Sequence, residues 1–223
     1  MLPERARTPS MINFEAVIRH FWQQAVRDVK WDHDHYDRGA LDALSNENAP
    51  NRRDTIRDWL QAYRVFRVRG IAAIQKSEIA DAILKWADSG KREGNPESAE
   101  ELSAAHKQLM ESVLDAYLRS SQSRPREFTS LTSKALWLCH PDEVPMFDGY
   151  AQRALWILAK LEAGVAGPPN GSEYYQFVSV WKQFYEKYRA TVSDLDTEGY
   201  PYRVRVFDRI LWLLGKGQYT VPD

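Results

Sequence analysis

The sequence predicts an all-α fold of about eight or nine helices. Apolar residues recur at three- and four-residue spacing through most of the chain, which is the spacing of one helical face. Sustained two-residue alternation with hairpin turns is missing, although YRVRVF at 202–207 has the composition of a strand. With 223 residues, 43% of them hydrophobic, we expect a single α-helical domain over residues 1–223. Two lobes with a cleft near residues 130–155 are one arrangement of that domain.

Local signals place each helix in turn. Phe14, Ile18 and Trp22 lie on one face of the first, and Pro96 stands in the first turn of the fifth, where its missing N–H costs nothing. Gly215 is a C-terminal cap for the last. The expected helices are 11–30, 38–46, 55–68, 77–88, 97–119, 132–139, 149–161, 172–190 and 203–215.

Composition excludes several classes of protein. A net charge of −1 gives no long-range attraction to nucleic acid or to anionic membrane. The single cysteine, Cys139, excludes an intramolecular disulfide and is expected to be a buried, inert thiol. No stretch has the length of a membrane span or the pattern of a signal peptide, so we expect a cytoplasmic protein with no membrane contact.

The common catalytic motifs are also missing. There is no glycine-rich phosphate loop, serine nucleophile elbow or HExxH zinc motif. His33 and His35 lie in WDHDHYD, but without further ligands at metal-binding spacing this segment is expected to be a polar loop. We therefore expect neither a metal nor a cofactor.

An arginine strip accompanies the apolar face of the helix expected at 55–68. Arg53, Arg57, Arg64 and Arg67 fall on one side of it. Such a strip suits contacts with phosphates, but a solvated face whose side-chain stems cover apolar neighbours is the favoured interpretation. Arg57 and Arg64 remain candidate nucleic-acid contacts.

The segment SLTSKALWLCHPDEVPMFDGYAQRAL, residues 130–155, departs most from a generic helical pattern. Asp148 is expected to cap the helix at 149–161, where its carboxylate accepts backbone N–H bonds. If that helix is central, Asp148 also lies near a cleft where burial tunes its pKa. Lys134 is expected at the start of the preceding helix, where a cation opposes the helix dipole. Helix stability therefore does not explain a lysine at this position, which favours a functional role.

This segment resembles the helix-hairpin-helix DNA glycosylases, most closely the 8-oxoguanine DNA glycosylase branch. That family shows a helix-starting GVGxK, an apolar helix, and P…VPVD opening a further helix. The resemblance implies that the Lys134 amine attacks the sugar C1′ and forms a Schiff base. It implies that Asp148 activates this nucleophile and stabilises the oxocarbenium-like transition state. Ser130 and Thr132 replace the glycines of the family's hairpin, and an extra residue separates Pro145 from Asp148.

The resemblance also implies a DNA partner and a modified base flipped into a pocket between lobes, in DNA repair or defence. Ser130, Thr132, Ser133 and Arg153 would then contact the DNA. Aromatic residues that could stack on the base are Trp137, Tyr150, Trp156, Phe207 and Trp212.

Two other functions remain open. A non-catalytic helical module that binds nucleic acid or protein is favoured by the lost glycines and the near-neutral charge. An enzyme acting on a small molecule or nucleotide is less favoured, because no phosphate motif supports it. The glycosylase-like interpretation requires Lys134 and Asp148 to face one cleft.

Overall fold

The computed structural model describes residues 13–63, 71, 73–91, 96, 98–119, 128–161 and 174–217. These residues form helices joined by turns and contain no strand, which confirms the all-α prediction. The helices are α1 (Phe14–Asp32), η1 (His33–Asp37), α2 (Arg38–Ser45), α3 (Arg52–Ala62), α4 (Ala73–Trp86), η2 (Ala87–Lys91), α5 (Ala99–Arg119), α6 (Thr129–Cys139), α7 (Gly149–Leu161), α8 (Tyr174–Lys187), α9 (Arg189–Asp194) and α10 (Arg203–Gly215). Because α1, η1 and α2 are continuous, and α4 continues directly into η2, the described residues form nine helical segments.

The polar segment at 33–37 is helical, and the prediction of a loop there is wrong. No glycine or proline interrupts it, so α1 continues through the π-helical turn η1 into α2. Asp37 is buried at the end of this turn and accepts hydrogen bonds from Trp59 Nε1 and Tyr63 Oη, both at 2.8 Å. π-Helical turns inside helices are frequent at functional sites. Tyr36 of this turn lines a pocket together with Trp31 and Asp32 at the end of α1.

Helix α6 is the most deeply buried helix of the candidate site. Every residue from Leu131 to Cys139 is buried, including Lys134. The helix begins at Thr129 rather than at residue 132, so Ser130 and Thr132, which the resemblance matches to hairpin glycines, lie inside it. Residues 120–127, between α5 and α6, lie outside the described residues.

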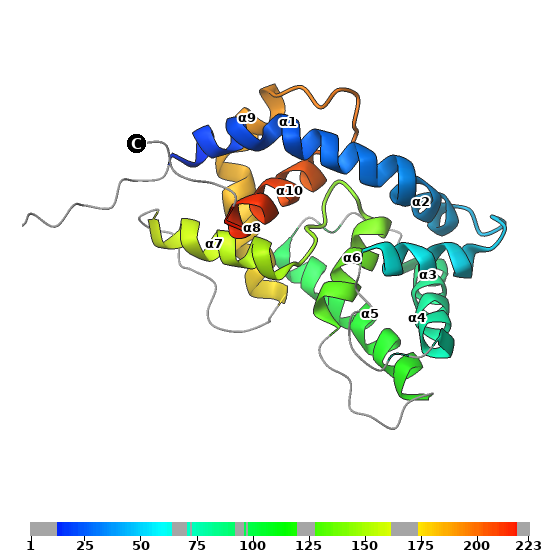
Figure 1. Cartoon of the computed structure of the whole chain (residues 1–223). Helices are drawn as coiled ribbons and strands as arrows, with labels where there is room; N and C mark the ends of the chain where they lie inside the picture. Colours follow the sequence, from blue (N-terminus) through cyan, green and yellow to red (C-terminus); the bar gives the residue numbers. More distant parts are fainter. Residues whose placement is uncertain are drawn as a thin grey trace, which may run out of the picture.

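The helices pack as two groups around one continuous hydrophobic core (Figure 1). In one group α10 packs against α1 and α7, and in the other α3, α4, α5 and α6 follow one another with α2 beside α3. The expected helix at 172–190 is divided at Tyr188 into α8 and α9. The segment 140–148 joins the two groups, because it connects α6 to α7.

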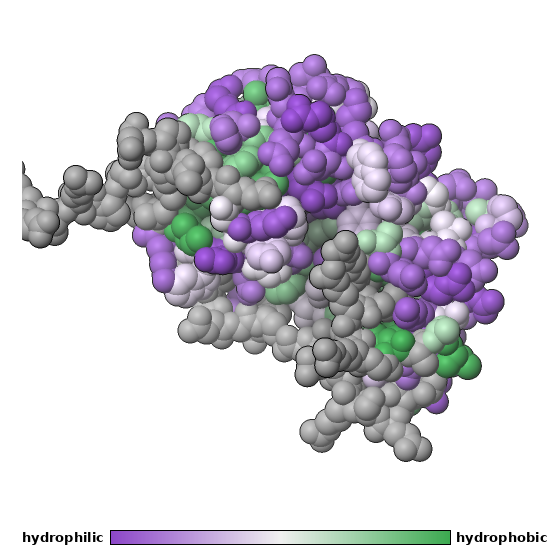
Figure 2. All heavy atoms as spheres, in the orientation of Figure 1, coloured by the Kyte–Doolittle hydropathy of each residue, from purple (hydrophilic) through white to green (hydrophobic). Residues whose placement is uncertain are grey.

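The outer face is largely hydrophilic where α1 and α9 lie at the top of the view (Figure 2). Among the described residues, α1 exposes Glu15, Arg19 and Arg27 and buries its apolar side. Among all the residues that the structure describes, no helix is both long enough and apolar enough to cross a membrane.

Candidate active site

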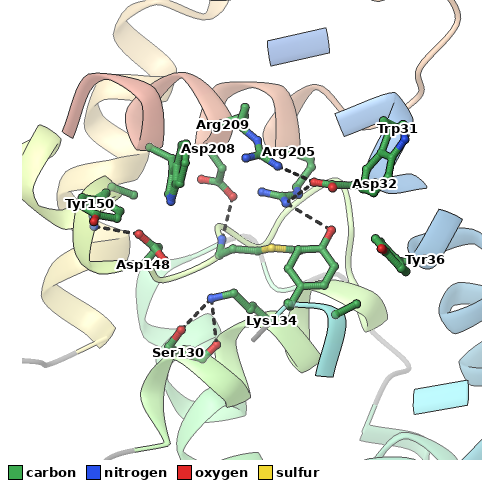
Figure 3. A pocket seen from close by; sticks show the side chains of 15 residues that line it. Trp31, Asp32, Tyr36, Ser130, Lys134, Asp148, Tyr150, Arg205, Asp208 and Arg209 are labelled. Carbon is green, nitrogen blue, oxygen red and sulfur yellow. Dashed lines mark hydrogen bonds and ion pairs between the residues drawn. The ribbon is translucent and has the colours of Figure 1, made fainter. Parts of the chain in front are cut away.

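A pocket of about 610 Å³ lies where the two groups of helices meet. Its volume is within the range usual for small-molecule sites, roughly 300–1,000 Å³. Its walls come from α1, η1, α3, α6, α7, α10 and the segment 140–148, so residues distant in sequence converge on it (Figure 3). The polar and aromatic side chains that line it are Trp31, Asp32, Tyr36, Tyr63, Ser130, Lys134, Asp148, Tyr150, Arg205, Asp208, Arg209 and Trp212.

Lys134 is the buried amine of this pocket, with only 6% of its surface exposed. Its Nζ donates to Ser130 Oγ at 2.7 Å, to the carbonyl oxygen of Phe147 at 3.0 Å and to that of Ser130 at 3.4 Å. It lies in the second turn of α6, so the expected position at the start of the helix is corrected. Burial lowers the pKa of the amine from 10.5 to about 8, and the Asp148 carboxylate opposes that shift.

Asp148 caps α7 as expected. Its Oδ1 accepts a hydrogen bond from the backbone N–H of Tyr150 at 2.8 Å. The side chain is half-buried and lines the same pocket as Lys134, so the two functional groups face one cavity (Figure 3). Asp148 therefore combines a structural role with a position beside the amine.

Two buried polar side chains hold the segment 140–148 in place. Ser133 Oγ accepts from the N–H of Phe147 at 3.0 Å, and Asp208 Oδ2 accepts from the N–H of Met146 at 2.8 Å. The second oxygen of Asp208 accepts from Trp181 Nε1 at 2.7 Å, and burial raises the pKa of this carboxyl to about 7. These contacts fix Phe147, which directly precedes Asp148 and whose carbonyl oxygen accepts a hydrogen bond from Lys134.

Of three residues in α6 expected to touch DNA, only Ser130 lines the pocket. Thr132 is fully buried, and its Oγ1 donates to the carbonyl oxygens of Phe128 and Thr129. Ser133 is also fully buried, beneath the segment it holds. The expectation of DNA contacts is therefore wrong for the side chains of Thr132 and Ser133, because both point into the core.

Arg57 and Arg153, two of the arginines expected to bind nucleic acid, do not line the pocket. Arg57 forms ion pairs with Asp54 at 2.7 Å and with Asp58 at 2.9 Å on its own helix. This arrangement is typical of a solvated helix face. Arg153 is exposed on α7 and is not among the lining residues. Arg64 lies outside the described residues.

Sequence reasoning missed an ionic cluster on the α10 wall. Nη2 of Arg205 and Nη2 of Arg209 approach Oδ2 of Asp32 at 3.4 and 2.5 Å. Arg205 Nη2 also donates to Tyr63 Oη at 3.3 Å. The signal was present in α10, where residues 205, 208 and 209 form a polar stripe at helical spacing and the other residues after Arg203 are apolar.

Aromatic side chains flank the pocket on two sides. Trp31 and Tyr36 are 52% and 38% exposed on one side, and Tyr150 is 44% exposed on the other. Tyr150 packs edge-to-face on Trp212, with ring centroids 5.6 Å apart. Of the other expected stacking residues, Trp137 and Phe207 are core residues, and Trp156 packs under Lys160 outside the pocket lining.

Gly215 sets the position of the α7 N-terminus. A Cβ at this residue would lie 1.8 Å from the carbonyl oxygen of Tyr150, so only glycine permits this approach of α10 to α7. The contact fixes the backbone next to Asp148. Gly215 is the last residue of α10 and Lys216 is its C-cap, so the expected capping role of Gly215 is corrected.

In the described part of the chain, no three metal-ligating side chains are grouped as a metal site would require. The chain matches no protein-family model, no curated protein and no solved structure. The function is therefore argued from the geometry of the pocket.

Proposed function

We propose that this protein is a DNA N-glycosylase-like enzyme that excises a modified base, with Lys134 as the nucleophile and Asp148 as its electrostatic partner. The observation that carries the proposal is the placement of a buried amine and a half-buried carboxylate in one open pocket. The resemblance of residues 130–155 to the helix-hairpin-helix glycosylases supports it independently, because it rests on the sequence alone.

The chemistry requires a neutral amine. With a pKa of about 8, roughly a fifth of Lys134 is deprotonated at pH 7.4, against less than about one in a thousand at 10.5. Burial in the pocket therefore increases the reactive fraction by about two orders of magnitude. This is the usual way in which a protein activates a lysine nucleophile.

The reaction then follows from the two side chains. The lone pair of Lys134 Nζ attacks C1′, and the C1′–N bond breaks with its electrons leaving on the base, which takes up a proton. Nζ loses a proton, the C1′–O4′ bond breaks as the ring oxygen takes up a proton, and C1′ and Nζ form a Schiff base. Water hydrolyses this Schiff base and releases the lysine. Asp148 stabilises the positive charge that develops on the sugar, because a fixed anion in a partly desolvated site acts strongly.

Access to such a pocket requires a nucleotide rotated out of the DNA stack. Trp31, Tyr36 and Tyr150 at its edges are exposed aromatic surfaces on which bases can stack. The near-neutral net charge implies that DNA affinity comes from local contacts around the pocket rather than from the field of the whole protein.

Borohydride trapping tests the proposal. Oligonucleotides that carry single oxidised, deaminated or alkylated bases are incubated with the protein and reduced, and base release is measured in parallel. Wild type should form a covalent adduct with at least one lesion, and Lys134→Gln should form none. Lys107→Gln, on the exposed face of α5, is the matched control. Binding without adduct or base release across the panel would instead support the non-catalytic module.

A further inference from the structure

The α10 wall of the pocket holds more hydrogen-bond donors than the described residues satisfy. Arg205 and Arg209 share a single carboxylate oxygen of Asp32. Within the described part of the chain, Nε of each arginine is buried without a hydrogen-bond partner. The hydrogen bonds of both guanidinium groups are made through Nη2 in the described part of the chain, which leaves Nη1 of each to donate to an acceptor supplied from the pocket.

The charge of the lining favours a neutral acceptor over a phosphate. Among the described lining residues, three are cationic and three are acidic: Lys134, Arg205, Arg209, Asp32, Asp148 and Asp208. Arg205 is only 7% exposed, whereas contacts with backbone phosphates come from side chains that reach the surface. A carbonyl oxygen on a neutral ring fits both the balance of charge and the depth of Arg205.

The aromatic side chains favour a planar ligand. Tyr150 lies on one side of the Lys134 amine and Trp31 and Tyr36 lie on the other, with Arg205 and Arg209 across from the amine (Figure 3). A ring bound between these faces would present one edge to the arginines. Its opposite side would face Lys134.

We propose that Arg205, supported by Arg209 and held by Asp32, reads a carbonyl oxygen on the edge of the bound base and rejects an amino group there. The inference rests on the proposed function, because it assigns the specificity of the same pocket. A guanidinium has donors and no acceptor, so an exocyclic amino group facing it leaves donors on both sides unpaired. Such a mismatch discriminates more strongly than a difference in shape.

Free nucleobases test this without DNA or turnover. Hypoxanthine and adenine differ at C6, which carries an oxygen in the first and an amino group in the second. Their binding to the intact protein is measured by calorimetry and by quenching of tryptophan fluorescence. Wild type should bind hypoxanthine at least about tenfold more tightly than adenine, which is the discrimination that one bidentate arginine contact can give.

Arg205→Lys keeps the charge that faces Asp32 and removes the planar fork. It should lower hypoxanthine affinity about tenfold and leave adenine affinity unchanged. Arg209→Lys, at a less buried position, should weaken hypoxanthine in the same direction and serves if Arg205→Lys does not fold. Arg19→Lys, on the exposed face of α1, is the control.

Equal binding of the two bases by wild type, or no binding of hypoxanthine, would overturn the inference. So would an equal loss for both bases in Arg205→Lys, which would assign the arginine to contacts unrelated to the C6 oxygen. Discrimination by wild type together with a failed trapping experiment would refute the proposed enzyme and leave the specificity of the pocket intact.

Discussion

The lowered pKa of Lys134 makes a quantitative prediction about stability. Between pH 8 and 10.5 the folded protein binds fewer protons at this residue than the unfolded chain does. The free energy of unfolding must therefore rise with pH through that window, because unfolding takes up a proton. From pH 7 to pH 10 this single group contributes a rise of about 2–3 kcal/mol.

Lys134→Met isolates this contribution, because methionine occupies similar space and carries no proton. Urea denaturation of both proteins at pH 7, 8, 9 and 10 gives the difference in the free energy of unfolding. Titrations of groups that do not interact with Lys134 cancel, whereas the pKa of Asp208, which the lysine charge lowers, rises in Lys134→Met and adds to the difference in the same direction. Wild type should gain about 2–3 kcal/mol relative to Lys134→Met across this range. Lys107→Met measures the effect of losing one exposed lysine charge.

A pH-independent difference between wild type and Lys134→Met would refute the reasoning. It would mean that the amine titrates alike in the folded and unfolded chains, and that the pocket does not prepare it for attack. The absolute stability of Lys134→Met is a separate quantity, since the variant also loses three hydrogen bonds to Ser130 and Phe147.

Three further substitutions separate architecture from chemistry. Gly215→Ala should destabilise the fold by about 1–3 kcal/mol in urea denaturation and reduce trapping, because its Cβ collides with Tyr150; unchanged stability would contradict that close approach. Ser133→Ala leaves the buried N–H of Phe147 unpaired and should cost about 1–3 kcal/mol by the same assay, whereas a neutral result would mean that the segment holds without it. Asp148→Asn retains a good helix cap, so the free energy of unfolding should change by less than about 1 kcal/mol. The rate of borohydride trapping should fall about a hundredfold, because the carboxylate charge is lost. A parallel loss of stability would assign Asp148 the role of a helix cap alone.

The local pattern of the sequence predicted the helices well where one signal dominated. The helix at 149–161 and its Asp148 cap follow from an acid before a long apolar run, and the structure has both. The segment at 33–37 was misread because its polarity suggested a loop. Its helix is stabilised by tertiary hydrogen bonds from Trp59 and Tyr63 to Asp37, which local pattern does not contain.

The candidate site was only partly accessible from the sequence. Lys134 and Asp148 were found through a short resemblance, but the argument from the helix dipole failed because α6 begins earlier than its apolar run suggested. The ionic cluster joins Asp32 to Arg205 and Arg209, residues 173 and 177 positions away. Only the fold brings these residues together. The polar stripe on α10 indicated Arg205 and Arg209, but nothing in the local pattern indicated Asp32 as their partner.

The central claim is that Lys134 itself attacks the sugar of a modified nucleotide. Mass spectrometry of the borohydride-reduced adduct, after proteolysis of the protein and nuclease digestion of the DNA, measures this most directly. We expect the reduced sugar to be attached to the peptide that contains Lys134, at that lysine. Attachment at any other lysine, or base release with no attached sugar at all, would contradict it.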